Sequence, residues 1–136
     1  MTAKEYLSQV QYLKRMIECR RKELTYWEDI ATSISGSNFE PHYNATRRTS
    51  AQYESAIEKI DEIQRDIDSA VIKLVDLCNK INKAIDELDS IQEQLMLRYR
   101  YLEGKTSFDV REIMNMSDST VYRIHASALR NFKIPE

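Results

Sequence analysis

A heptad pattern without a break runs from Tyr53 to Leu88 and constrains the fold of this chain more than any other feature. Apolar residues recur there at alternating spacings of three and four, at positions 53, 56, 60, 63, 67, 70, 74, 77, 81, 84 and 88. This spacing predicts one long amphipathic helix whose apolar seam packs against another helix. Thr49, with Gln52 three residues later, predicts the start of that helix through a capping box.

A second amphipathic helix is expected before it. Thr2 and Glu5 form another capping-box pattern, and apolar residues follow at positions 10, 13, 17, 24, 27, 31 and 34, with Arg20 as the one interruption. The interval of about residues 35–50 contains Gly36 and Pro41 and predicts a connecting loop. Residues 1–88 are therefore predicted to form a long antiparallel hairpin, a coiled-coil-like stalk. Only 2 Gly and 2 Pro in 136 residues leave too few turn residues for a β fold and support an all-α class.

The apolar stripe of the second helix is wider than one partner helix would cover. Positions 57, 71, 78 and 85 each follow a seam position and are also apolar. We expect these positions to be buried in a homodimer formed through the second long helix. The alternative is a monomer in which the first helix covers the whole stripe.

Residues 89–136 predict three short helices. Ser90 and Glu93 form a capping-box pattern, although Ile91 keeps the heptad phase, so the chain across residues 88–91 could be broken or continuous. Gly104 is placed to end the first short helix, and a second is expected at about residues 107–114, with Asn115 in the turn. The third follows Ser117 as N-cap and carries apolar residues at positions 121, 124, 128 and 132. Two short helices around a tight turn predict a helix-turn-helix.

Three runs carry a family resemblance: residues 97–106, 117–125 and 128–130. They resemble the fourth conserved region of bacterial sigma factors, a helix-turn-helix, over about residues 90–133. The whole chain resembles small sigma-like proteins of Gram-positive prophages that are related to the ArpU-type regulators of late phage transcription. Arg111 departs from the pattern, because such motifs place a small residue where the two helices approach, and so its stem must bend outward or the crossing must open. No segment resembles the part of a sigma factor that melts the promoter, so a complete sigma factor is not expected.

The resemblance implies a sequence-specific regulator that binds double-stranded DNA, with the helix at about Asp118–Phe132 in the major groove. The positions that match base-facing places in the family are Asp118, Ser119, Tyr122 and Arg123, and Arg123 is the strongest candidate for reading a guanine edge. No carboxylate occurs from Ser119 to Pro135, so local positive charge is expected there. The candidates for phosphate contacts are Thr120, His125, Arg130, Lys133, Arg98 and Arg100.

Two other functions are open at this stage. The protein could be a sigma-like adaptor that docks on RNA polymerase or another protein, or a DNA-packaging adaptor similar to small terminase subunits. An enzyme, a metal site and a cofactor are not expected, because the two histidines, His42 and His125, lie far apart in the sequence and the carboxylates are spread along helix surfaces. No signal peptide or apolar span is recognised, which predicts a cytoplasmic protein without membrane contact, and Cys19 and Cys78 are expected to be free thiols.

Overall fold

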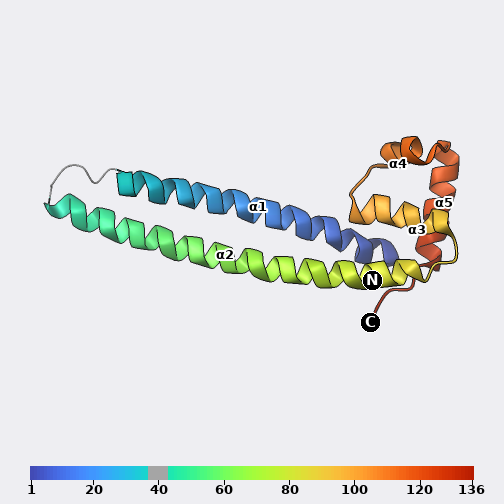
Figure 1. The fold of residues 1–136 in the computed structure, drawn as a ribbon, viewed down its shortest axis with the longest axis horizontal. Coiled ribbons are helices and arrows are strands. Elements are labelled where there is room, and N and C mark those ends of the chain that lie inside the picture. Colours follow the sequence, from blue (N-terminus) through green and yellow to red (C-terminus); the bar gives the residue numbers. More distant parts are fainter. Residues whose placement is uncertain (37–42) are drawn as a thin grey trace. The chain divides into compact units, whose positions relative to one another are not determined.

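The computed structural model describes residues 1–36 and 43–136, and every regular element in these two ranges is a helix (Figure 1). In chain order they are α1 (Ala3–Gly36), α2 (Tyr43–Asp86), α3 (Ile91–Leu97), η1 (Arg98–Leu102), α4 (Ser107–Met114) and α5 (Asp118–Asn131). The prediction of an all-α fold with a long helix pair followed by short helices is confirmed. Within the described ranges, none of the helices has the length and apolar character needed to cross a membrane.

The residues group into two compact units. One contains residues 15–72, and the other, here called the terminal unit, contains residues 1–14 with 73–136. The sequence predicts a different division, at residue 88, into a dimerisation stalk and a DNA-binding part. That division concerns function, so the packing of the two units does not test it and it stays a prediction.

In the 15–72 unit, parts of α1 and α2 lie side by side along an apolar seam. Its buried members are Ile17, Ala31, Ala56, Ile63 and Ile67, which follow the predicted heptad positions. Arg20, the interruption of the first seam, keeps its guanidinium at the edge of the pair. There it contacts Glu23 at 2.9 Å on its own helix and Asp66 at 3.3 Å on α2.

The start of the second long helix was predicted wrongly. α2 begins at Tyr43, so Thr49 lies inside the helix and is not its N-cap, and the second half of the predicted 35–50 loop is helical. The sequence from Tyr43 to Ser50 contains no Gly or Pro, and extending an existing helix adds one hydrogen bond for each residue fixed. Residues 37–42 of the predicted loop lie outside the described residues.

The terminal unit is built around a core that joins both ends of the chain. Leu7 and Val10 of α1 pack with residues of α2, α3, η1 and α5, and the members from those elements and their flanks are Ile81, Ala84, Ile85, Leu88, Leu97, Tyr101, Ala128 and Phe132. Ile85, one of the residues that widen the apolar stripe, is therefore fully buried within a single chain. α2 ends at Asp86, and Ser90 caps α3 by accepting a hydrogen bond from the Glu93 backbone N–H at 3.3 Å. α2 and α3 are therefore two separate helices and not one continuous helix.

The short helices follow their local signals closely. Gly104 and Asn115 have φ values of 71° and 53°, so both adopt the left-handed conformation that ends a helix. α4 spans the predicted residues and begins with a capping box in which Thr106 and Asp109 bond each other's backbone N–H groups. These hydrogen bonds lower the pKa of Asp109. A second apolar cluster of Met96, Val110, Val121 and Ile124 joins α3, α4 and α5.

Candidate nucleic-acid interface

α4 and α5 are consecutive helices joined by a tight turn. Three residues, 115–117, separate the end of α4 from the start of α5, and α5 packs against both α3 and α4. Val121, Ile124 and Ala128 form its buried inner face. Because a helix that buries one face presents the opposite face to solvent, this packing selects the residues that a ligand of α5 can reach.

Three of the four predicted base-reading residues lie on the outer side of α5 and form no hydrogen bond or ion pair with α4 within the described residues. Ser119, Tyr122 and Arg123 are exposed, and Tyr122 keeps 76% of its surface. Within the described part of the chain, Arg123 has neither a hydrogen bond nor an ion pair. Arg130, also exposed, continues the same side at helical spacing. Lys133 is exposed as well, but it lies beyond the end of α5 at Asn131, after the extended Phe132, so helical spacing does not place it on this side. Ser119, Tyr122, Arg123 and Arg130 therefore line one exposed, carboxylate-free face of the helix, here called the α5 outer face.

Asp118, the fourth base-reading candidate, is exposed but engaged in an ion pair. Its carboxylate lies 3.2 Å from Nη1 of Arg111 on α4. The Arg111 guanidinium also contacts Glu112 at 3.0 Å and stacks 4.5 Å from the centre of the Phe108 ring. Arg111 thus bends outward, one of the two solutions expected from the sequence, and its charge bridges α4 to the first turn of α5.

Thr120 belongs to the cap of α5 and is half-buried. The Ser117 hydroxyl oxygen accepts a hydrogen bond from the Thr120 backbone N–H at 3.3 Å and lies 2.8 Å from Thr120 Oγ1. The same oxygen lies 3.2 Å from Ser119 Oγ. These hydroxyls stabilise the start of α5 in the absence of any ligand.

His125 is held inside the terminal unit and not on the α5 outer face. Its Nε2 shares a 2.7 Å hydrogen bond with the hydroxyl of buried Tyr101. Burial is the main cause that lowers the pKa of His125, and the charges of Arg100 and Lys4 lower it further. Burial also raises the pKa of Tyr101. The lowered pKa favours the neutral form of the His125 ring.

The two arginines of η1 also make internal contacts. Arg98 pairs with Asp86 and donates to Gln94 Oε1 at 3.5 Å. Arg100 donates from Nη1 to the Lys105 carbonyl at 2.9 Å, and its buried Nε has no partner in the described residues. Of the six predicted phosphate contacts, Arg130 lies on the α5 outer face with Arg123, and Lys133 is exposed just beyond the end of α5. The other four, Thr120, His125, Arg98 and Arg100, make contacts within the protein.

Three residues that were not predicted as site residues hold α5 and η1 in place: Glu93 contacts α5, and Gln11 and Lys14 contact η1. The Glu93 carboxylate, 9% exposed, accepts hydrogen bonds from Ser127 Oγ at 2.6 Å and from Asn131 Nδ2 at 3.1 Å. Gln11 Nε2 donates to the carbonyls of Tyr101 and Leu102 at 2.9 and 3.2 Å, and Lys14 Nζ donates to the second of these at 2.6 Å. Glu93 had a sequence signal, its place in a capping box, but that signal indicated a different partner. Gln11 and Lys14 had none, because their acceptors lie about 90 residues away.

Comparison with known proteins gives one finding. A family model described as "Protein of unknown function (DUF1492)" matches residues 43–133, from the first residue of α2 to just beyond α5. No curated protein and no solved structure gave a match.

Proposed function

This chain belongs to the DUF1492 family, and we propose that it is a non-catalytic transcriptional regulator of phage type that binds double-stranded DNA through α5. The observation that carries the proposal is the α5 outer face. It combines an unpaired arginine, an exposed tyrosine and a second arginine on the second helix of a helix-turn-helix, and Lys133 adds an exposed cation just beyond that helix. The resemblance of residues 90–133 to sigma region four supports the same function.

In the proposed complex, the amino-terminal half of α5 lies in the major groove. Arg123 donates two hydrogen bonds to O6 and N7 of a guanine, a contact worth about 1–3 kcal/mol of discrimination between bases. Ser119 and Tyr122 flank it, and Tyr122 is placed for a thymine methyl group or a phosphate. Arg130 and Lys133 neutralise phosphates, which orients the helix without reading sequence. The proposal assigns Asp118 to holding Arg111 and not to base reading.

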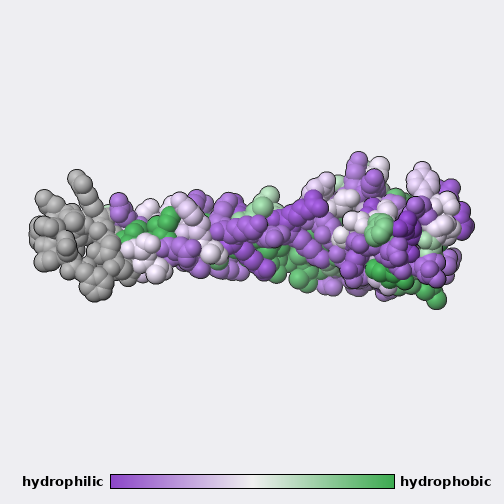
Figure 2. Space-filling view, turned by 90° about the horizontal axis from the view of Figure 1, so that it is seen from above, coloured by the Kyte–Doolittle hydropathy of each residue, from purple (hydrophilic) through white to green (hydrophobic). Residues whose placement is uncertain are grey.

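The proposal includes a cytoplasmic homodimer that forms through the second long helix. Supporting it, Ile57 and Ile72 of α2 keep 36% and 70% of their surface exposed in the single chain. Figure 2 shows a mainly hydrophilic surface with smaller apolar patches on the visible face. A two-fold symmetric protein with two copies of α5 would bind a DNA site made of two half-sites.

DNA binding can be tested by fluorescence anisotropy on labelled duplex fragments at low and moderate salt. We expect the affinity to fall steeply with salt, because each neutralised phosphate releases condensed counterions. Arg123→Ala should lower the affinity for the preferred fragment by roughly 5- to 150-fold. Arg65→Ala, an exposed arginine on α2, is the matched control and should behave as the unmodified protein. Absence of binding at low salt, or equal loss in both variants, would contradict the proposal.

A second candidate function is docking on a protein such as RNA polymerase. It is favoured by the apolar side chains that α4 exposes, Phe108 at 60% and Ile113 at 49%. Burial of apolar surface depends little on moderate salt, whereas phosphate contacts depend on it strongly. Binding to polymerase that persists in salt and is abolished by Phe108→Ser, but not by Arg123→Ala, would select this alternative.

A further inference from the structure

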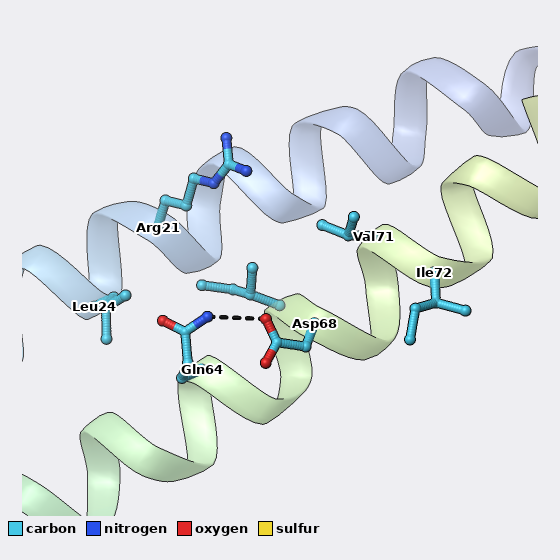
Figure 3. Close-up of a pocket in the computed structure, with 7 residues that line it drawn as sticks. Arg21, Leu24, Gln64, Asp68, Val71 and Ile72 are labelled. Carbon is cyan, nitrogen blue, oxygen red and sulfur yellow. Dashed lines mark hydrogen bonds between the residues drawn. The ribbon is translucent and has the colours of Figure 1, made fainter.

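We propose that two copies of this chain meet at a groove between α1 and α2 within the 15–72 unit. The groove, here called the α1–α2 groove, is lined by Arg21, Leu24, Gln64, Ile67, Asp68, Val71 and Ile72 (Figure 3). The inference rests on the proposed homodimer and adds where its interface lies and what holds it together.

The α1–α2 groove is mostly apolar and open. It encloses about 390 Å³. Ile67 is buried, Leu24 and Val71 are half-buried, and Ile72 remains 70% exposed. In Figure 3, Val71 points toward α1 whereas Ile72 points away from it. An exposed isoleucine therefore lies next to the α1–α2 groove. A second copy placed face to face would cover both the groove and the projecting Ile72.

The two rims of the groove carry opposite charges. Arg21 extends from α1, and Asp68 lies on α2, where it accepts a hydrogen bond from Gln64 Nε2 at 3.0 Å (Figure 3). Neither Arg21 nor Asp68 forms an ion pair within the described residues. A two-fold axis that runs between the rims sets Arg21 of each copy opposite Asp68 of the other. The same surface is therefore complementary to itself, as a two-fold interface requires, and this identifies a second copy as the occupant.

The interface can be tested by sedimentation equilibrium on the full chain without DNA. Ile72→Glu would place a carboxylate in the contact twice, once from each copy, and we expect it to raise the dimer Kd at least about 100-fold. Ile91→Glu is the matched control, because Ile91 is 72% exposed on α3, and it should leave the Kd unchanged. Equal helical content by circular dichroism would show that both variants fold.

A charge exchange tests the predicted pairing. Arg21→Asp or Asp68→Arg alone would set like charges opposite each other and weaken the dimer, and the double exchange should restore it. A monomeric unmodified protein, an assembly larger than a dimer, an Ile72→Glu variant that dimerises normally, or a double exchange that fails to recover would each overturn the inference. Because these measurements contain no DNA, failure of DNA binding leaves them unaffected. A monomer that binds DNA normally would refute the interface alone.

Discussion

Replacing Glu93 by alanine should loosen α5 from α3 without touching the α5 outer face. The Glu93 carboxylate lies under the last turns of α5 and receives three contacts, one from Ser127 at 2.6 Å and two from Asn131 at 3.1 Å. A hydrogen bond to a charged group contributes about 1.5–3 kcal/mol. Ser127 is half-buried and would lose its partner, whereas Asn131 is exposed and can bind water instead. We therefore expect Glu93→Ala to lower the free energy of unfolding by about 2–3 kcal/mol, most of it from the Ser127 contact.

Urea titration followed by circular dichroism measures this loss, and amide hydrogen exchange in α5 locates it. Glu93→Gln keeps an oxygen for Ser127 and should lose roughly half as much. Glu87→Ala is the control, because Glu87 is exposed and follows α2. If Glu93→Ala unfolds within about 0.5 kcal/mol of Glu87→Ala, the carboxylate does not anchor α5 and the reasoning is refuted.

Two further predictions concern the contacts that hold the terminal unit together. The pKa of His125 is lowered in the folded state, so the unfolded chain binds the proton more tightly. The free energy of unfolding should therefore be highest above about pH 6.5, the ordinary pKa of histidine, and should decrease as the pH falls below it. Thermal melts between about pH 7 and pH 5.5 should therefore show a smaller decrease for His125→Asn, and an unchanged decrease would contradict burial of the neutral ring. Gly104→Ala should cost about 1–2 kcal/mol, because φ is 71° and the new Cβ would lie 2.7 Å from Gln11 Oε1. A melting temperature equal to that of the unmodified protein would refute it.

The sequence predicts those parts of the fold that depend on neighbouring residues. Ser117, Asn115 and Gly104 act on their own helix ends, so the bounds of α4 and the start of α5 could be predicted without knowledge of tertiary contacts. The heptad spacing depends only on helical geometry and gave the buried seam. The start of α2 at Tyr43 could not be predicted in this way, because the polar residues before Ser50 fit a loop or an exposed helix equally well.

The exposed residues of the candidate site could be predicted from the sequence, whereas the buried contacts that hold α5 in place could not. Tyr122 and Arg123 lie opposite the apolar positions of α5, so the period of the helix places them in solvent. His125 lies on the same helix, but its burial depends on Tyr101, which is 24 residues away. The Glu93 contacts with α5 likewise depend on packing between elements, which no spacing within one helix contains. Four of the six side chains predicted to bind phosphate therefore make contacts within the protein that the sequence did not predict.

Base reading by Arg123 can be measured by selection of bound sequences from a random duplex library. The unmodified protein and Arg123→Ala are each used to enrich bound DNA, and the selected sequences are compared. We expect the unmodified protein to enrich a motif with at least one fixed guanine. With Arg123→Ala this guanine preference should disappear while the other positions of the motif remain. No motif from either protein, or the same motif from both, would contradict base reading by the α5 outer face.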